Sequence, residues 1–448
     1  MKRKYSVVII GGGPGGVTAA LSARNTYPDK QVLLIRKEKI TLIPCGIPYV
    51  LHSLEKVEDD ILPDKPLENN NVDLEVNEVI DIKGNFIELR NGEQIEYERL
   101  ILAVGSKPFV PPIAGMDKDG IYFIKKDIDY LKELKDRVEQ SENIVIIGGG
   151  FIGVEVADEL LKKGKNVVIV EMLSSLLPFS MDPEFGNMVR EILEERGAKV
   201  ITGIGVKEIL GGRKVEFITL HDDTKYPADL VIVATGYRPN LDLAKKIGVK
   251  IDPRFGIITD EYMKTSVDGI LAVGDCVAKR HFLTGEYSKL MLASSAMAQG
   301  RLAGSNLFEF KVIKEFAGTL GTFSTKIGDT AFASVGVTET QAKSLGIDYI
   351  VGINETVDRH PGKLHGASKI YMKLIFSKYS HLLLGAQIKG GDSVGELINM
   401  LSVMIQKKMT DIEIDTLQIG THPLLTPSPI AYPVINATVN AIMKWYKR

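Results

Sequence analysis

The sequence predicts an α/β protein built around two similar domains, because one local pattern occurs twice along its 448 residues. In each copy an apolar strand leads into three glycines spaced G-x-G-x-x-G, and a helix follows. The copies are strand 5–10 with Gly11, Gly13 and Gly16, and strand 143–147 with Gly148, Gly150 and Gly153. A side chain in such a turn would keep backbone N–H groups from a pyrophosphate or the helix from its strand. Two copies therefore predict two bound dinucleotides.

The two copies agree beyond their glycines. Residues 86–100 and 215–231 each predict a β-hairpin, around an Asn-Gly and an Asp-Asp turn. Each hairpin leads into a strand that ends in small residues, and the candidates there for cofactor contact are Ala103, Gly105 and Gly236. The closing glycine follows the third glycine of the turn by 89 residues in one copy (105 minus 16) and 83 in the other (236 minus 153). This agreement indicates an internal duplication of Rossmann-like domains.

The residues that end the second strand of each copy predict which ribose binds. Glu171 ends strand 166–171, about twenty positions after the second glycine turn, where a carboxylate accepts the ribose 2′-hydroxyl. A carboxylate would repel a 2′-phosphate, so the second site predicts NADH, with NADPH the weaker ligand. In the first copy Arg36 and Lys37 precede the acid. Glu38 is therefore displaced and is a candidate for the ribose of that site.

Composition excludes several classes of function. The apolar fraction of 44% is ordinary for a globular protein, and a net charge of -2 argues against nucleic acid as a partner. Two cysteines give no disulfide framework, and no signal peptide precedes the first strand, so we expect a cytoplasmic protein. The uncharged segment 417–443 contains four prolines that would break a membrane helix, and a buried interface is expected there instead. Nothing indicates a metal site.

Two further segments extend the pattern to nearly the whole chain. Residues 265–275 end in Gly274-Asp275, and residues 44–49 read Pro-Cys-Gly-Ile-Pro-Tyr. With the glycine turns, they make the chain resemble the flavoprotein pyridine nucleotide-disulfide oxidoreductases, in particular their single-cysteine branch of coenzyme A disulfide reductases, NADH oxidases and NADH peroxidases. The resemblance implies FAD at the first glycine turn. It also implies that Asp275 accepts hydrogen bonds from the ribityl hydroxyls, and that the following helix points its N-terminus at the flavin.

The resemblance also implies a domain order. An FAD-binding domain would be split between residues 1–114 and 249–324, with the NAD-binding domain, residues 115–248, inserted. Residues 325–448 would form an α+β dimerisation domain, so the expected assembly is a homodimer.

Cys45 is the predicted redox thiol. Pro48 suits the first turn of a helix, and a thiol at a helix N-terminus has its pKa lowered. Family members with two redox cysteines carry the second five positions later, where this chain has Val50. The oxidised form of Cys45 would therefore be a mixed disulfide with a small thiol, or a sulfenic acid. Cys276 is expected to be a small buried side chain without a redox role.

The branch offers alternatives for the final electron acceptor. Its peroxidases and water-forming oxidases carry a histidine in the first glycine turn, whereas this turn holds Pro14, a candidate for cofactor contact, and no histidine. A small disulfide or polysulfide is therefore the main expectation, oxygen reduction by an NADH oxidase is the alternative, and a low-turnover redox sensor is a third. The two active-site tyrosines of coenzyme A disulfide reductases are missing, since their positions fall on His360 and on Thr421 or Leu425. Coenzyme A thus stays one candidate among small thiols, and Arg24 is a candidate contact for its nucleotide.

Two histidines are candidates for the general acid that protonates the departing thiol. Thr421-His422-Pro423 resembles the segment by which dithiol reductases bring a histidine across the dimer interface, although their following glutamate is Pro427 here. His422 of one subunit would then serve Cys45 of the other. His360, which precedes Pro361-Gly362, is the second candidate. The predicted electron path runs from NADH to FAD, to Cys45, and then to the small disulfide.

Overall fold

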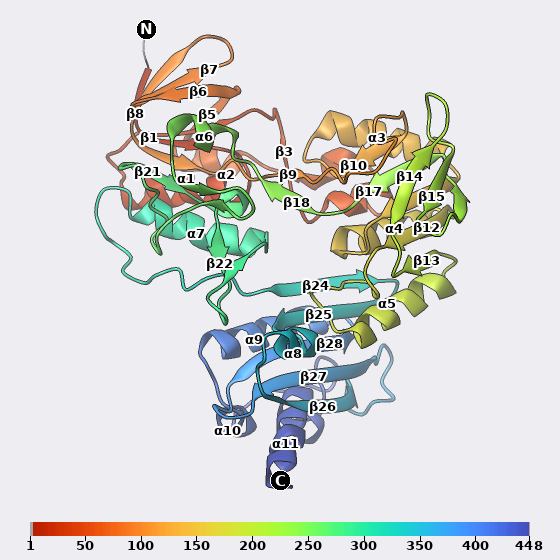
Figure 1. Ribbon diagram of the computed structural model, residues 1–448. Helices are drawn as coiled ribbons and strands as arrows, with labels where there is room; N and C mark the ends of the chain where they lie inside the picture. Colours follow the sequence, from red (N-terminus) through yellow and green to blue (C-terminus); the bar gives the residue numbers. More distant parts are fainter. Residues whose placement is uncertain (1–2, 448) are drawn as a thin grey trace. The chain divides into compact units, whose positions relative to one another are not determined.

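The computed structural model describes residues 3–447, which form two compact units (Figure 1). The first unit comprises Met1–Pro111, Phe123–Arg137 and Thr235–Thr319, and the second comprises Pro112–Tyr122, Val138–Ala234 and Leu320–Arg448. Parallel sheets flanked by helices in both units confirm the predicted α/β class. The second unit holds most of the predicted NAD-binding segment together with the predicted dimerisation segment. The three finer domain boundaries therefore stay a prediction.

A seven-stranded sheet forms the centre of the first unit. Its order is β5-β2-β1-β8-β7-β6, and β21 pairs with β8. Strands β5, β2, β1, β8 and β21 run parallel, and β6, β7 and β8 form an antiparallel meander. The bounds are β1 (Arg3–Ile10), α1 (Pro14–Thr26), β2 (Val32–Arg36), β5 (Asp73–Val76), β6 (Val79–Lys83), β7 (Phe86–Leu89), β8 (Gln94–Leu102), β21 (Ile270–Ala272) and α7 (Ala293–Ser305).

Both faces of this sheet are buried. Successive side chains of a strand point to opposite faces, so Val7 and Ile9 belong to the cluster that contains the alanines of α1 and α7. Val8 and Ile10 belong to the other cluster, with side chains from the meander. Burial on both faces explains why strand β1 ends in an unbroken apolar run rather than an alternating one.

Short elements complete the first unit and hold its loops. Strands β3 (Thr41–Leu42) and β4 (Ile61–Leu62) pair antiparallel and close the loop that contains Cys45. The other short elements are η1 (Ile47–Leu51), η2 (Val57–Asp60), α2 (Lys65–Asn69), β9 (Ser106–Pro108), β18 (Tyr237–Pro239), α6 (Asp242–Ile247), β19 (Ile251–Asp252), β20 (Gly256–Ile257), η3 (Gly274–Cys276), β22 (Lys279–Arg280) and β23 (Tyr287–Ser288). The division of the chain into units falls within two further elements, β10 (Ile121–Phe123) and α3 (Ile128–Gln140).

The second unit repeats the strand, turn and helix of the first. Its five-stranded sheet has the order β10-β17-β11-β12-β13, and a separate antiparallel sheet has the order β14-β15-β16. The bounds are β11 (Asn143–Ile147), α4 (Phe151–Lys162), β12 (Asn166–Glu171), α5 (Pro183–Glu195), β13 (Lys199–Thr202), β14 (Val206–Leu210), β15 (Phe217–Leu220), β16 (Lys225–Pro227) and β17 (Leu230–Val233). Both predicted hairpins are confirmed, as β7–β8 and β15–β16. They differ because β8 continues into the main sheet, whereas β16 and β17 are separate strands.

An antiparallel five-stranded sheet, coloured from teal to blue in Figure 1, completes the second unit. Its order is β24-β25-β28-β27-β26, and α9 packs on β25 and β28 while α11 packs on β26 and β27. The bounds are β24 (Thr322–Ile327), β25 (Thr330–Gly336), α8 (Glu339–Ser344), β26 (Tyr349–Val357), β27 (Lys369–Ser377), β28 (Leu383–Gly390), α9 (Val394–Gln406), α10 (Asp411–Asp415), η4 (Pro429–Ala431) and α11 (Pro433–Tyr446).

A buried ion cluster ties the N-terminus of α5 to this sheet. Lys373 on β27 is 3% exposed, and its Nζ lies 3.0 Å from Asp182 Oδ2 and 2.7 Å from Glu339 Oε2. Burial opposes ionisation of Asp182, but hydrogen bonds from Thr340 and Gln387 and the charge of Lys373 outweigh it, and the pKa of Asp182 is held at about 2. The carboxylate is therefore charged at neutral pH, and the cluster depends on its lysine.

We expect Lys373→Met to destabilise the protein strongly, because it leaves carboxylates in a buried site without their cation. Removing one partner of a buried ion pair typically costs about 3–5 kcal/mol. The free energy of unfolding in urea at pH 7 measures the effect. Lys369→Met is the matched control, since Lys369 lies on the same strand and is exposed. Equal losses in the two variants would contradict the role of the cluster.

Candidate active site

The first glycine turn leaves no room for side chains at Gly11 and Gly16. Gly11 has a φ of +119°, and a Cβ atom there would lie 2.1 Å from the backbone oxygen of Ala103. A Cβ on Gly16 would lie 1.9 Å from the backbone oxygen of Gly11. The backbone N–H of Gly11 donates to Ile35 at 2.8 Å. Both glycines are thus required by the close approach of β1, β8 and α1.

Gly13 faces open space instead. It is the N-cap of α1, no side chain caps that helix, and a Cβ on Gly13 would meet no atom within 4 Å. Pro14 occupies the first helical turn, where its missing N–H costs nothing. The exposed end of α1 therefore forms a cradle that fits a pyrophosphate, which is the group that the predicted FAD would place there.

The second glycine turn reproduces the first in detail. Gly148 has a φ of +112° and donates its N–H to Val170 at 2.8 Å. A Cβ on Gly153 would lie 2.0 Å from the backbone oxygen of Gly148, and one on Gly150, the N-cap of α4, would meet nothing within 4 Å. The second cradle thus fits another pyrophosphate. The duplication inferred from the sequence extends to the contacts of individual glycines.

Glu171 lies beside the second cradle at the end of β12. Its two carboxylate oxygens accept the backbone N–H groups of Gly149 and Leu173, each at 2.7 Å. The half-buried carboxylate is therefore held at the edge of the turn by groups that do not neutralise its charge. This is the position at which a carboxylate could accept a ribose 2′-hydroxyl and repel a 2′-phosphate.

Arg36 takes the corresponding place in the first unit. A Cβ on Gly12 would lie 2.7 Å from its Cδ, just as one on Gly149 would meet the side chain of Glu171. Arg36 is 3% exposed, and its Nη2 donates to Asp64 Oδ2 at 2.7 Å. Its Nε donates to the backbone oxygen of Glu38 at 3.0 Å. Sequence reasoning missed the Arg36–Asp64 pair, which holds the segment that carries Glu38.

Asp275 and Gly105 follow neighbouring parallel strands, β21 and β8. Asp275 Oδ2 accepts a hydrogen bond from Ser106 Oγ at 3.0 Å. Gly274 has a φ of +82°, and its N–H donates to the side chain of the buried Gln299 at 2.8 Å. Carboxylate, small residues and glycine cradle thus meet at the carboxyl edge of one sheet, where α/β proteins bind ligands.

The structure adds two titratable groups with shifted pKa values that sequence reasoning missed. Lys279 is 3% exposed, and its Nζ donates to the backbone oxygens of Gly274 at 2.9 Å and Val277 at 3.3 Å. Burial lowers the pKa of Lys279. Glu155 follows the second glycine turn on α4; burial raises its pKa to about 7, although Thr325 Oγ1 donates to it at 2.8 Å. No local pattern marks either residue, because burial depends on the folded chain.

The two thiols have opposite surroundings. Cys45 is exposed, in a turn closed by the N–H of Gly46 donating to Ile43 at 2.9 Å. Cys276 is fully buried, and burial raises the pKa of its thiol to about 11. A thiol that stays protonated and inaccessible is a poor nucleophile, which agrees with a structural role for Cys276.

One prediction about Cys45 needs correction. The segment after it, η1, is a 3-10 helix of five residues rather than an α-helix, and its N-cap is Gly46. Pro48 does lie in the first turn, but Cys45 precedes the cap. So short a helix carries little dipole, so the structure does not support the helix-dipole argument, and the lowered pKa of Cys45 stays a prediction.

The two candidate histidines lie together in the second unit. The backbone N–H of His360 donates to the oxygen of Pro423 at 3.1 Å, and His360 Nδ1 lies 3.0 Å from the oxygen of Thr426. A carbonyl oxygen only accepts, so Nδ1 carries the proton in this contact. His422 is exposed, and its Nδ1 accepts the N–H of Leu424 at 3.2 Å.

The predicted interface segment exposes large apolar side chains in the isolated chain. Leu425 is 66% exposed and Ile430 is 87% exposed. Such apolar exposure is typical of surfaces that a partner covers. No helix among residues 3–447 has both the length and the apolar character needed to cross a bilayer.

The guanidinium of Arg24, a half-buried residue, is engaged by backbone carbonyls. Its guanidinium donates to the backbone oxygens of Pro28 at 2.6 Å, Lys30 at 3.0 Å and Asn70 at 3.2 Å. These carbonyls lie after the end of α1 and after α2, so Arg24 fastens the loops there. This engagement weakens the case for Arg24 as a contact for a coenzyme A nucleotide.

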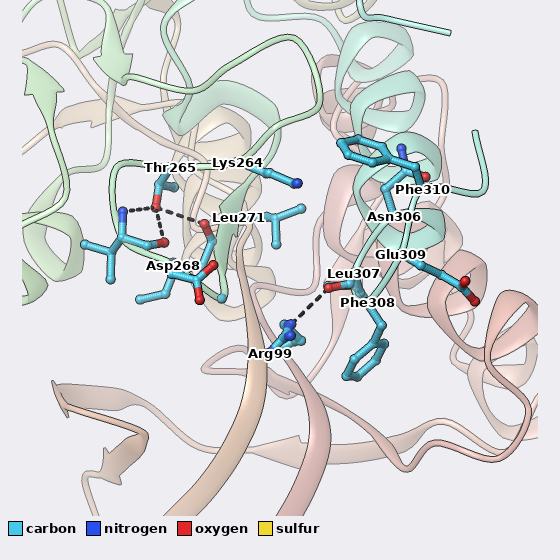
Figure 2. Close-up of a pocket in the computed structure, with 13 residues that line it drawn as sticks. Arg99, Lys264, Thr265, Asp268, Leu271, Asn306, Leu307, Phe308, Glu309 and Phe310 are labelled. Carbon is cyan, nitrogen blue, oxygen red and sulfur yellow. Dashed lines mark hydrogen bonds between the residues drawn. The ribbon is translucent and has the colours of Figure 1, made fainter. Parts of the chain in front are cut away.

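A cavity of about 230 Å³ in the first unit is separate from these features (Figure 2). It lies where β21 begins, whereas the cradle residues follow the ends of the strands. Arg99 donates to the backbone oxygen of Leu307 at 2.9 Å, and Lys264 Nζ lies 4.2 Å from the ring centroid of Phe310. Its cations are thus already engaged, and we do not assign the redox site to this cavity.

Comparison with known proteins places these features in a family. The family model for pyridine nucleotide-disulphide oxidoreductases matches residues 5–300. The model for the dimerisation domain of the same family matches residues 322–430. The predicted resemblance and the predicted dimerisation domain are thereby confirmed.

Two curated archaeal relatives differ in their named activities. The NADH oxidase of Methanocaldococcus jannaschii is 35% identical over 98% of both chains. The NAD(P)H coenzyme A polysulfide/persulfide reductase of Pyrococcus horikoshii is 35% identical over 88% of both chains. Sequence similarity alone therefore does not separate the two activities.

Solved structures show the same division. The NAD-dependent persulfide reductase of A. fulgidus has a TM-score of 0.91 and 32% identity, covering 99% of this chain and 84% of that one. The water-forming NADH oxidase of Lactobacillus brevis, bound to NADH, has a TM-score of 0.88 and 25% identity, covering 99% of this chain and 98% of that one. Relatives of both kinds are NAD(P)H-dependent, the family uses FAD, and its dimerisation domain supports a homodimer. The chain belongs to the pyridine nucleotide-disulphide oxidoreductase family of NAD(P)H-dependent flavoprotein enzymes.

Proposed function

We propose that the protein passes electrons from NADH through FAD to Cys45, and from Cys45 to a small disulfide, polysulfide or persulfide. The observation that carries this proposal is the exposure of Cys45, the accessible thiol of the two in a chain whose other cysteine is buried. Val50, at the place of a second redox cysteine, is fully buried and offers no sulfur. A lone accessible thiol in this family is suited to exchange with an external sulfur compound.

The two cradles divide the cofactors between them. FAD would be held by Gly11, Gly13, Pro14, Gly16, Ala103, Gly105, Gly274 and Asp275, with Glu38 a candidate for its ribose. NADH would be held by Gly148, Gly150, Gly153, Glu171 and Gly236. When bound, FAD supplies a two-electron carrier between the nicotinamide and the thiol. The end of α1 would hold the pyrophosphate with its free backbone N–H groups, and Asp275 would accept hydrogen bonds from the hydroxyls of the ribityl chain.

The thiol chemistry itself belongs to the chain. The Cys45 thiolate attacks one sulfur of the disulfide, so a new S–S bond forms to Cys45 while the old S–S bond breaks. The departing thiolate takes a proton, for which His422 of the partner subunit is the first candidate donor and His360 the second. Two electrons that originate from NADH, with one further proton, then release the second thiol and restore the Cys45 thiolate.

Coenzyme A is one member of the substrate class that we propose. It is supported by the name of the Pyrococcus horikoshii relative and weakened by the engagement of Arg24 with backbone carbonyls. Mass spectrometry of protein purified without reductant reads the adduct on Cys45 directly. A coenzyme A or persulfide adduct supports disulfide chemistry, whereas a sulfenic acid favours oxygen as the acceptor.

Oxygen reduction is the second candidate function, favoured by the full-length similarity to the NADH oxidase of Methanocaldococcus jannaschii. Steady anaerobic NADH consumption that depends on an added disulfide would establish the first function. Consumption that requires oxygen would establish the second. A single stoichiometric bleaching of the flavin without turnover would instead indicate a redox sensor.

Cys45→Ser should keep its FAD and still be bleached by NADH, because that transfer does not need sulfur. It should lose disulfide reduction almost completely, and its oxygen consumption should persist or rise. Cys276→Ser is the matched control and should keep near-normal turnover. Near-normal disulfide turnover in Cys45→Ser would show that Cys45 is not the redox thiol.

Glu171 should give NADH an advantage over NADPH of at least about tenfold in kcat/KM, which corresponds to about 1.4 kcal/mol. Removing the charge in Glu171→Gln should lower the ratio of kcat/KM for NADH to kcat/KM for NADPH. Glu195→Gln, which changes an exposed residue on α5, should leave that ratio unchanged. Steady-state kinetics with both nucleotides test this. Equal kcat/KM values for NADH and NADPH in the native enzyme would show that Glu171 does not select the nucleotide.

His422→Ala should lower disulfide turnover by about 10²- to 10⁴-fold, the usual contribution of a positioned general acid. Flavin bleaching by NADH should stay intact, and the exposed His365→Ala serves as the control. Mixing His422→Ala with Cys45→Ser subunits should restore activity, because one site of the hybrid dimer keeps both residues. If exchange of subunits is demonstrated and no activity returns, the acid does not come from the partner.

A further inference from the structure

A buried carboxyl group lies directly against the turn that carries Cys45. Strands β3 and β4 bring Asp60 opposite Ile43, whose N–H donates to the backbone oxygen of Asp60 at 2.9 Å. A Cβ on Gly46 would lie 1.8 Å from Asp60 Oδ1. The carboxyl therefore packs on the Cα of the residue that follows Cys45. Since consecutive Cα atoms are about 3.8 Å apart, Oδ1 lies within about 7 Å of the Cys45 Cα.

This carboxyl is short of partners. Asp60 is 2% exposed, and among residues 3–447 no donor reaches its Oδ2. Burial alone raises the pKa of Asp60 to about 6. A buried carboxyl without a cation is costly unless it is protonated, so its charge changes within the pH range in which the enzyme would work.

The charged groups around Asp60 are engaged elsewhere. On the adjoining turn, Asp59 accepts the N–H of Lys56 at 2.9 Å, and Glu58 lies 2.6 Å from Lys132 of α3. Lys135 of α3 donates to backbone oxygens after η1. Tyr49 and His52 are the other titratable side chains of the η1 segment. None of these groups contributes to the shift of the Asp60 pKa, for which burial is the cause.

We propose that Asp60 is a positioning residue for Cys45: its carboxyl shapes the cysteine turn through Gly46, and its ionisation controls how readily the Cys45 thiol ionises. A negative carboxylate so near opposes a thiolate, whereas a protonated carboxyl does not. The two groups therefore titrate as a coupled pair. As the pH rises and Asp60 loses its proton, its negative charge opposes formation of the Cys45 thiolate. The inference rests on the proposed redox role of Cys45 for its functional meaning.

The test is the rate at which iodoacetamide alkylates Cys45 in the reduced holoenzyme, measured by mass spectrometry of its peptide between pH 5 and 9. The native rate should show an extra inflection near pH 6. In Asp60→Asn the inflection should vanish and the rate at pH 8 should rise at least about threefold. Asp60→Ala should show the same change. Because it buries no polar side-chain atom, it keeps the test valid if the buried amide of Asp60→Asn prevents folding.

Glu58→Gln is the matched control, because it removes an exposed negative charge two residues from Asp60. Its alkylation rate should stay within about 1.5-fold of the native rate. Native-like profiles in both Asp60 variants would overturn the proposal, as would an equal change in Glu58→Gln. Alkylation does not require turnover. If Cys45→Ser keeps disulfide turnover, the proposed function fails. The coupling between Asp60 and Cys45 is still decided by the alkylation rates alone.

Thermal unfolding gives a second test, because a purely steric role of Asp60 would not make the effect of Asp60→Asn on the Tm depend on pH. The folded-state pKa of Asp60 lies above its unfolded value, so the native protein binds this proton more tightly than the unfolded chain. Its stabilising contribution is present below pH 4 and is lost as the pH rises through about 6. The Tm of Asp60→Asn should therefore improve relative to the native Tm between pH 5 and 8. A constant difference across that range would contradict a buried titrating carboxyl.

Discussion

The close approach of a helix to the strand before it is the constraint on which the rest of the structure depends. Side chains at Gly16 and Gly153 would collide with backbone oxygens of Gly11 and Gly148 at about 2 Å. Only this approach lets the first turns of α1 and α4 face the cradles without a side chain between them. A single added methyl group would push the helix off its strand and remove the anion site with it. The same contact therefore determines both packing and cofactor capacity.

Duplication preserved this contact but not the chemistry beside it. Glu171 remains at the edge of the second cradle, where its carboxylate accepts only backbone N–H groups. In the first unit the corresponding place holds Arg36, which is buried and paired with Asp64. A buried cation needs such a partner to offset its lost hydration. With an arginine in place of the glutamate, Asp64, in the segment after η2, therefore helps to hold the first cradle. The same architecture can thus hold two different dinucleotides.

Local rules explain what could be predicted from the sequence. Glycine spacing, strand periodicity and turn residues act over a few positions, and they gave both cradles and both hairpins. The Arg36–Asp64 pair, the packing of Asp60 on Gly46 and the burial of Lys279 each join or enclose residues through the folded chain, and no local spacing marks them. The sequence also did not reveal how short the helix after Cys45 is, because Pro48 indicates where a helix begins but not how far it runs.

The surroundings of the two thiols show how the fold separates reactivity from composition. Cys276 lies in η3, after β21, and is buried among apolar side chains, which raise the pKa of its thiol and keep it inaccessible. Cys45 sits on an exposed turn, yet a buried carboxyl lies beneath that turn at Asp60. An unpartnered buried carboxyl lowers stability, and packing alone could be achieved with an apolar side chain. Titratable groups with shifted pKa values cluster at functional sites because reactivity needs them, and the buried Asp60 beside the exposed Cys45 fits the redox role that we propose for this turn.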